Sequence, residues 1–232
     1  MIARTANCDF CSELAGCLEN AFDRIYSRDL KSRLLFRSEE LVVMPSLGQI
    51  ADGHLLLLPI QHWTALADLP ESLLKEFAVL FAGVSAILKE QYGSCVSFEH
   101  GVRPGGSGGC GISHAHLHTV PFPAELDPVD TLRTKFTYRL IEDLKEIGKQ
   151  SEGMSGYLFY QDSDSRSYMF DAPRLPSQYM RRVLAEALGT NDWDWRSAGR
   201  EDRLVATVNR LSNYFEGIGV LHGSQKTHGN PG

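Results

Sequence analysis

The chain has 232 residues, of which 43% are hydrophobic, and its formal net charge is −6 at pH 7. This length and hydrophobic content allow a proper core in one or two domains. The acidic balance, without a basic cluster, argues against broad nucleic-acid binding through phosphate neutralisation. No apolar run approaches the ~20 residues that span a bilayer, and residues 1–5 lack the apolar region of a signal peptide. Five cysteines, an odd number, fit a reducing compartment better than a disulfide framework, so we expect a cytoplasmic protein.

The first part of the chain predicts strands around one long helix. Short apolar runs at 34–36 and 41–44, separated by a polar turn, predict a hairpin. The continuous apolar run 55–60 is typical of a central strand that is covered on both faces. Residues 70–92 repeat apolar side chains at helical spacing and are followed by a glycine, so they predict a helix with a glycine C-cap. Residues 95–99 then predict another strand.

The second part predicts further helices and one more hairpin. Apolar residues at helical spacing predict a helix over 130–149. Residues 157–161 and 167–170 flank a polar turn and predict a hairpin. Two more helices are expected at about 176–188 and 201–215.

These elements predict a compact α/β unit, the core, with an appended C-terminal part. Residues 126–222 are expected to form an additional C-terminal α/β extension that packs on the core. The glycine-rich and polar tail, 223–232, is expected to be disordered.

Three histidines stand at alternate positions, His114, His116 and His118, after the glycine-rich run 105–111. On a β-strand alternate side chains point to the same face, so the three imidazoles would share one face and the two intervening apolar residues the other. A polar strand face that happens to be rich in histidine is one interpretation. A metal-binding tract is another, because imidazole is the commonest metal ligand. We favour a phosphoryl-handling active site.

Three motifs in the chain resemble those of the histidine triad (HIT) superfamily. Residues 114–120 match its His-φ-His-φ-His-φ-φ pattern, in which φ is apolar, except that Thr119 takes one apolar position. Residues 53–62 are similar to its GHxLxxPxxH strand, and residues 8–16 to the CxFCxxxxG opening of its zinc-containing branch. The resemblance covers about residues 8–123. Within that superfamily the chain is similar to Hint-type proteins and dinucleoside polyphosphate hydrolases, and more distantly to galactose-1-phosphate uridylyltransferase. The resemblance implies an α+β fold with an antiparallel sheet flanked by helices, and a catalytic core over residues 1–125 that includes an N-terminal metal-binding segment.

The chemistry of imidazole and the resemblance together suggest a role for each histidine. Near its usual pKa of ~6.5, imidazole is a good nucleophile and also a good leaving group. His116, the middle one, is therefore expected to attack the α-phosphorus and form a nucleotidyl-histidine intermediate. The resemblance implies that the backbone carbonyl of His114 holds the other ring nitrogen of His116. It also places His54 and His118 beside the phosphate, where both would bind the nucleotide and stabilise negative charge.

The glycine-rich run is expected to bring backbone N–H groups close to phosphate, because glycine has no Cβ in the way. Ser107, Gly109 and Gly111 are the candidate phosphate-binding residues. Relatives with a simple hydrolase site carry Gln-Ser before the first histidine, where this chain has Cys110 and Gly111. Side-chain help from those positions would have to come from Ser107 or Ser113.

Cys8 and Cys11 form a CxxC pair, which with two distant histidines would make a closed tetrahedral set for structural zinc. Spacing alone does not choose the histidines. Similarity to zinc-containing relatives implies His62 and His114. A reduced CxxC pair without metal is the alternative.

In the C-terminal part, Arg181 and Arg182 have the guanidinium chemistry that binds phosphate. The simpler interpretation, which we favour from the sequence, is an amphipathic helix with a solvated basic face. His100 either lines the site or ends its strand.

The sequence therefore predicts a nucleotide hydrolase that releases a nucleoside monophosphate from a nucleotide conjugate, with structural zinc as the metal. The expected partner is a nucleotide substrate, with no nucleic acid and no membrane, and the resemblance leaves a homodimer open. One alternative is a nucleotidyltransferase or dinucleoside polyphosphate phosphorylase. Transferases of this superfamily typically carry glutamine at the third histidine, so His118 argues against it. The other alternative is a non-enzymatic nucleotide-binding or zinc-stabilised interaction protein.

Overall fold

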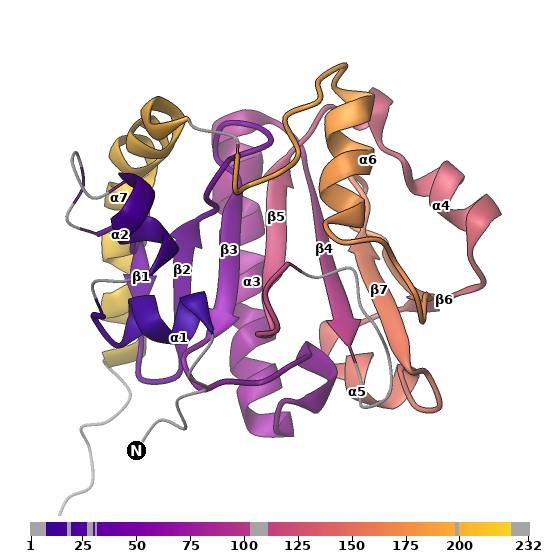
Figure 1. Ribbon diagram of the computed structural model, residues 1–232. Coiled ribbons are helices and arrows are strands. Elements are labelled where there is room, and N and C mark those ends of the chain that lie inside the picture. The colour runs from indigo at the N-terminus through magenta and orange to yellow at the C-terminus, as the bar shows by residue number, and fades with distance from the viewer. Residues whose placement is uncertain are drawn as a thin grey trace, which may run out of the picture.

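The computed structural model describes residues 8–17, 20–26, 30, 32–102, 111–197 and 200–223. Within them, strands from both halves of the chain form one antiparallel sheet in the order β1-β2-β3-β5-β4-β7-β8-β6 (Figure 1). The strands are β1 (Phe36–Arg37), β2 (Leu41–Pro45), β3 (Leu55–Pro59), β4 (Cys95–Val102), β5 (Leu117–Pro121), β6 (Tyr138–Ile141), β7 (Gly156–Gln161) and β8 (Ser167–Asp171). The predicted α+β class is confirmed.

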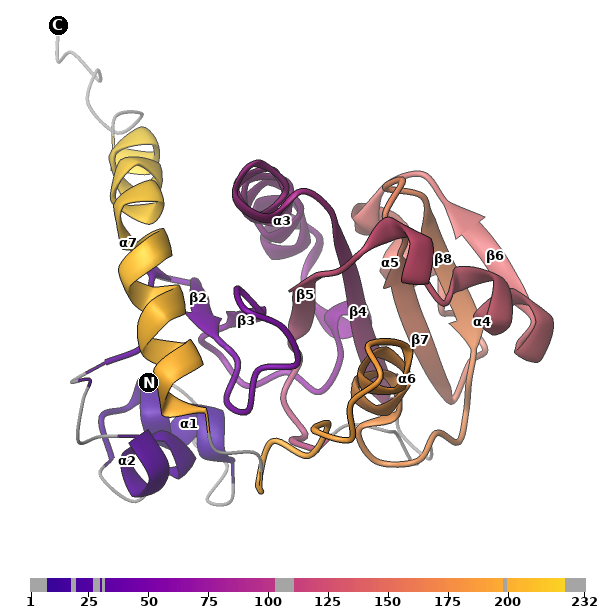
Figure 2. The ribbon, with the colours of Figure 1, turned by 90° about the horizontal axis from the view of Figure 1, so that it is seen from above.

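Helices cover both faces of this sheet (Figure 2). The α-helices are α1 (Asp9–Leu14), α2 (Ala21–Tyr26), α3 (Glu71–Tyr92), α4 (Val129–Lys135), α5 (Ile147–Gln150), α6 (Tyr179–Ala187) and α7 (Glu201–Gly223). Short 3₁₀ turns lie at η1 (Leu66–Asp68), η2 (Ala124–Leu126) and η3 (Leu144–Glu146). Seen from above, α3 lies on one face, whereas α1, α2 and α6 lie on the other. Among the described residues, no helix combines the length and apolar character that a membrane span requires.

The face with α3 holds the largest apolar core. Phe77 and Val84, two of the helix residues at the predicted spacing, are fully buried there. They belong to the same cluster as Leu57 of β3 and Leu117 of β5. The amphipathic pattern of residues 70–92 therefore arises because one side of α3 packs on the middle of the sheet. Gly93 ends the helix with φ 95°, as its predicted C-cap role requires.

On the opposite face, two separate helices cover two separate parts of the sheet. Phe10 of α1 packs with Met44 and Leu56, so α1 covers β2 and β3. Met180 and Leu184 of α6 pack on β4 and β7. Because β5 lies between β3 and β4, it runs between the two covered areas. This is the place where the histidine motif lies.

Several predicted elements are confirmed. The hairpins formed by β1 with β2 and by β7 with β8 are antiparallel, as expected. The strands β3 and β4 and the helices α3 and α6 occupy the predicted segments. The last helix, α7, begins at the predicted residue but extends to Gly223, beyond the expected end at 215. Residues 224–232, which make up most of the predicted tail, lie outside the described residues.

The prediction of one helix over 130–149 is wrong. Helix α4 ends at Lys135, and Phe136 is extended at φ −127° and ψ 147°. The chain then forms β6, which pairs with β8. Phe136 and Tyr138 both contact the ring of Phe170 on β8, so tertiary packing overrides the helical pattern. Leu140, placed on the apolar side of the predicted helix, is 63% exposed.

The histidine motif begins before its strand, which differs from the prediction. Strand β5 starts at Leu117, so His114 and His116 precede it. The carbonyl of His114 accepts from the ring of His116 instead of a neighbouring strand, and the N–H of Ala115 donates to Trp63 O at 2.6 Å. The alternation of side chains persists nevertheless, since Ala115 and Leu117 are buried in the core that contains α3.

The C-terminal half joins the sheet through main-chain hydrogen bonds. Strand β4 pairs with β5 on one side and with β7 on the other. Strands on both sides of the predicted boundary between 125 and 126 therefore belong to one sheet. The division into a core and a C-terminal extension that fold as separate units stays a prediction.

A glycine in β4 provides a test of this junction. Gly101 pairs with Tyr157 of β7, and a Cβ added at Gly101 would lie 2.0 Å from the ring carbon Cζ of Tyr157. The hydroxyl on that same ring carbon donates to Glu99, which hinders movement of the ring away from a new side chain. We expect Gly101→Ala to lower the free energy of unfolding by about 1–3 kcal/mol, measured by urea denaturation.

Gly83→Ala in α3 is the matched control. No atom lies within 4 Å of a Cβ added at Gly83, so this change should be neutral or stabilising by about 0.5–1 kcal/mol. Equal unfolding free energies for the two variants would contradict the close packing of β4 on β7.

Candidate functional site

A pocket opens on the sheet between α1 and α6. Phe10 of α1 contributes to one wall, Arg181 of α6 to another, and Trp195 of the following loop to a third. His116 and His118 also line the pocket. Segments from both ends of the chain therefore enclose the histidine motif.

His116 is oriented by the backbone. Its Nδ1 lies 2.5 Å from the carbonyl oxygen of His114, which is the contact that the resemblance implies. A carbonyl can only accept a hydrogen bond, so Nδ1 carries the proton and the lone pair is on Nε2. The ring of Phe10 meets the His116 ring edge-on at 5.2 Å and limits its rotation. The imidazole thus has a defined tautomer, which a nucleophile requires.

A second chain of hydrogen bonds fixes His54 and His118. The N–H of Ile50 donates to His54 Nδ1 at 3.4 Å, so the proton of His54 is on Nε2. His54 Nε2 lies 2.9 Å from His118 Nδ1, which therefore accepts. It follows that His118 carries its proton on Nε2. Its ring stacks on Phe98 at 4.4 Å and lies 4.8 Å from the ring of His116. The ring of His118, with its Nε2–H donor, thus lies beside the ring of His116, whose Nε2 has the lone pair.

Burial keeps these imidazoles neutral. It lowers the pKa values of His54 and His118 well below the usual value. The pKa of His116 is also lowered by burial, and the positive charge of Arg181 adds to this, while the His114 carbonyl and Glu99 act in the opposite direction. Neutral imidazoles keep their lone pairs, so the site favours nucleophilic attack over cation formation.

Glu99 is a buried carboxyl group on the α3 side of the sheet. Burial raises its pKa to about 7, against the hydrogen bonds that it accepts from Leu66 N–H and the Tyr157 hydroxyl at 2.7 Å each. Its neighbour on the other side of β4, His100, lines the pocket, and His100 Nε2 accepts from Met180 N–H at 3.3 Å. His100 therefore lies in the site, which was one of the two interpretations of its sequence position.

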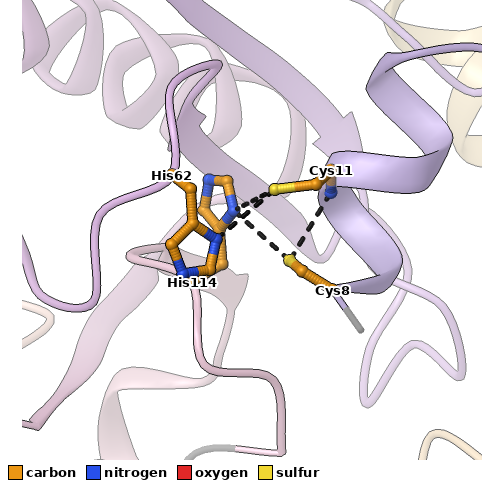
Figure 3. A group of neighbouring side chains, drawn as sticks. All are labelled: Cys8, Cys11, His62 and His114. Carbon is orange, nitrogen blue, oxygen red and sulfur yellow. Dashed lines mark hydrogen bonds between the residues drawn. The ribbon is translucent and has the colours of Figure 1, made fainter. Parts of the chain in front are cut away.

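Cys8, Cys11, His62 and His114 come together in one group, although the sequence separates them widely. Their four candidate ligand atoms all lie within 4.8 Å of one another (Figure 3). Cys8 Sγ is 3.5 Å from His114 Nδ1, and Cys11 Sγ is 3.4 Å from His62 Nδ1 and 3.6 Å from His114 Nδ1. This group could hold a metal ion.

The surroundings of this group orient its members. His114 Nε2 lies 2.8 Å from the carbonyl oxygen of Pro59, so Nε2 carries the proton and the lone pair of Nδ1 points at the thiols. Cys8 is also the N-cap of α1, since Cys11 N–H donates to its Sγ. Burial raises the pKa of the Cys8 thiol to about 12, and ligation of a cation reverses such a shift.

The glycine-rich run is described only at its end. Gly111 lines the pocket, and a Cβ added there would lie 3.0 Å from Trp195 Nε1. Ser113 is exposed. Ser107, Gly109 and Cys110 lie outside the described residues, so their predicted roles stay predictions.

The interpretation of a solvated basic face is wrong for Arg181, which is 3% exposed and lines the pocket. Arg182 lies on the next helical position and stacks on the ring of Trp193 at 3.9 Å. A sequence signal for the burial of Arg181 existed, because Leu184 and Ala185 follow it by three and four residues and share its helical face. Phe10 belongs to the CxFCxxxxG motif, but neither its position nor that of Trp195 indicated that the two rings line the pocket.

Comparison with known proteins gives one family match and distant relatives. Residues 19–128 match the family model described as scavenger mRNA decapping enzyme C-term binding. CWF19-like protein 1 of Mus musculus is 26% identical over 183 residues, which cover 73% of this chain and 33% of that protein. The protein of the same name from Homo sapiens is 25% identical over 184 residues, which cover 73% and 32%. The chain spans about a third of the length of these curated relatives.

Solved structures with partial likeness include two histidine triad proteins. A hypothetical histidine triad nucleotide-binding protein from Sulfolobus tokodaii is 23% identical, with a TM-score of 0.37 over 49% of this chain and 68% of that chain. A HIT family protein from Bacillus anthracis is 19% identical, with a TM-score of 0.39 over 51% and 74%. The family-model match covers less than half of the chain and includes two of the three sequence motifs, those at 53–62 and 114–120.

The burial of His100 predicts how stability depends on pH. Burial lowers its pKa to about 3, whereas in the unfolded chain it titrates near the usual 6.5. The unfolded state therefore takes up a proton below pH 6.5 that the folded state does not. This contribution to stability is full above pH 6.5 and is lost as the pH falls toward 3, by up to about 1.4 kcal/mol per pH unit.

We expect His100→Gln to flatten the fall in unfolding free energy between pH 7 and pH 5, measured by urea denaturation at several pH values. The other buried histidines remain in the variant, so part of the slope should persist. Parallel pH profiles for the two proteins would contradict the buried, neutral state of His100.

Proposed function

We propose that this protein is a nucleotide hydrolase. It cleaves a phosphoanhydride, phosphoramidate or related bond of a nucleotide conjugate through a nucleotidyl-His116 intermediate and releases a nucleoside monophosphate. The observation that carries this proposal is the hydrogen bond from His116 Nδ1 to the carbonyl of His114, because it leaves the lone pair on Nε2 in a lined pocket.

In the first step, His116 Nε2 attacks the α-phosphorus and forms an N–P bond. The bond between phosphorus and the leaving group breaks, and its electron pair goes to the leaving group, which takes up a proton from water. The His116 ring becomes positively charged, and the hydrogen bond from Nδ1 to the His114 carbonyl stabilises that charge. The adjacent Nε2–H of neutral His118 donates a hydrogen bond to a non-bridging oxygen and keeps its proton.

In the second step, water attacks the same phosphorus and loses a proton to the surrounding water. The N–P bond breaks, its electron pair returns to Nε2, and the nucleoside monophosphate leaves. His118 supports water as the acceptor, because the resemblance associates transferases with glutamine at this position. A nucleotidyltransferase or phosphorylase shares the first step, and the walls that the C-terminal segment adds to the pocket favour it as the second candidate.

We propose zinc as the ion for Cys8, Cys11, His62 and His114. With zinc–sulfur and zinc–nitrogen bonds of about 2.3 and 2.0 Å, neighbouring corners of a tetrahedron are roughly 3.5 Å apart. The sulfur–nitrogen distances of 3.4, 3.5 and 3.6 Å agree with that spacing. Four protein ligands leave no position for substrate, so zinc would be structural and would tie α1 to the histidine motif.

The family-model match widens the substrates to test. Its description names an mRNA decapping enzyme, so cap-type dinucleotides belong beside nucleoside polyphosphates and phosphoramidates in a substrate panel. The test is turnover of this panel in plain buffer, with products identified by mass. We expect a nucleoside monophosphate, at a rate that inorganic phosphate does not raise.

His116→Gly should lower turnover by several orders of magnitude and leave binding of a nucleoside monophosphate largely intact. Activity of the variant within about tenfold of the wild type would rule out His116 as the nucleophile. A wild-type protein that is inert until phosphate is added, and then yields a nucleoside diphosphate, would be a phosphorylase.

For the metal, we expect about one zinc per chain in protein purified without chelator. The double variant Cys8→Ser, Cys11→Ser should lose it and melt at a lower temperature. Cys17→Ser is the control, since Cys17 is exposed and lies outside the group of four, and it should keep both metal and stability. Zinc that persists in the double variant would show that its ligands lie elsewhere.

A further inference from the structure

The C-terminal segment 178–196 brings a buried cation to the pocket. Arg181 lines the same pocket as His116 and His118 and is almost completely buried. Resting on the proposed function, we propose that Arg181 binds a phosphate of the substrate next to the reacting phosphorus. Through Arg181, helix α6 then contributes to the active site and sets the requirement for an anionic ligand.

The guanidinium group is held in a fixed position by two distant parts of the chain. Arg181 Nε donates to the carbonyl of Trp193 at 2.7 Å. Its two terminal nitrogens donate to the hydroxyl of Ser46, at 3.2 Å, and to the carbonyl of Gly48. These acceptors follow β2, more than 130 residues earlier in the chain. An arginine fixed in this way loses little further side-chain entropy when it binds a ligand.

Arg33 and Arg181 both line the pocket, but they differ in the groups to which they donate. Arg33 forms a bidentate ion pair with Glu13, with nitrogen–oxygen distances of 2.7 and 2.6 Å, so a carboxylate neutralises it. The three acceptors of Arg181 named above are a hydroxyl and two carbonyls. The pKa of the nearby Asp194 carboxyl is lowered, against burial, by its hydrogen bond from Gln178 and also by the charge of Arg181. Because Arg181 itself lines the pocket, its guanidinium also acts on an anion that enters there, and phosphate is the anion that the reaction brings.

The field of Arg181 reaches the reacting groups. The pKa values of both His54 and His118 are lowered mainly by burial, and the charge of Arg181 contributes to the shift in each. A cation that acts on these imidazoles also acts on a phosphate bound beside them, with the opposite sign. It would stabilise the negative charge on the non-bridging oxygens in both steps of the reaction.

The loop after α6 attaches this helix to the rest of the pocket. Both ends of the Gln178 side-chain amide bind the loop, with Nε2 donating to Asp194 and Oε1 accepting from Trp195 N–H. Arg196 donates to the carbonyl of Gly111, just before the histidine motif. The loop thus connects α6 to the chain that carries His116, and it holds Arg181 at a constant position relative to the motif.

The experiment compares ligands that differ only in the phosphate. Calorimetry measures the binding of four nucleoside 5′-monophosphates and their four nucleosides to wild type, Arg181→Gln and Arg181→Lys. We expect Arg181→Gln to bind the preferred monophosphate about 10- to 100-fold more weakly, with the affinity for its nucleoside changed less than threefold. Arg181→Lys should give an intermediate loss, because it keeps the charge without the fork geometry.

Arg182→Gln is the matched control, since Arg182 is adjacent on α6 but stacks on Trp193 and is not a pocket-lining residue. It should bind both ligand series as the wild type does. Melting temperature and metal content establish that each variant is folded. If Arg181→Gln does not fold, the Arg181→Lys variant decides, and a loss of threefold or more on the monophosphate alone supports the proposal.

Unchanged monophosphate affinity in the folded Arg181 variants would overturn the proposal, as would equal losses for monophosphate and nucleoside. These outcomes are separate from the fate of the proposed function. A wild-type protein without hydrolase activity whose phosphate preference disappears in Arg181→Gln would refute the hydrolase and retain the anion site. If the wild-type protein is a hydrolase and its preference for phosphate survives in Arg181→Gln, the hydrolase proposal is retained and the anion site at Arg181 is refuted.

Discussion

One residue, His114, connects the two chemical centres of this protein. Its Nδ1 faces the thiols of Cys8 and Cys11, its Nε2 is bound to the Pro59 carbonyl, and its own carbonyl accepts from His116. A shift of His114 would disturb both centres at once, because neither contact can be kept while the other moves. In the proposed reaction, a metal held by the four candidate ligand residues would influence catalysis without an open coordination position, because it would fix the backbone that selects the tautomer of His116.

Burial has opposite effects on the two functions proposed for the pocket. It lowers the pKa values of the imidazoles, which suits a nucleophile but leaves little positive charge to bind a phosphate. Arg181 supplies that charge, since a guanidinium stays ionised when it is buried. The two requirements are thus met by different residue types from different parts of the chain. The C-terminal half of the chain therefore supplies residues to the pocket as well as strands to the sheet.

Sequence reasoning succeeded where the information is local or motif-encoded. The spacing of apolar residues predicted α3, and the family motifs named four residues that the fold brings together as a group able to hold metal. It failed where the outcome depends on distant contacts. The helical pattern after Lys135 gives way to β6 because β8 offers hydrogen bonds and an aromatic surface. Helical spacing places Arg181 on the same face as Leu184 and Ala185, but no local pattern indicates its acceptors beyond β2.

The double pairing of β4 has a consequence for dissecting the protein. Residues 97–102 of β4 bond to β7, which belongs to the part of the chain that the motifs do not cover. A fragment that ends near residue 125 would leave this row of N–H and C=O groups without partners, on a strand with buried apolar side chains. Such an edge is a template for pairing with other chains, so the fragment would self-associate or aggregate. The smallest piece suited to expression therefore includes the hairpin of β7 and β8.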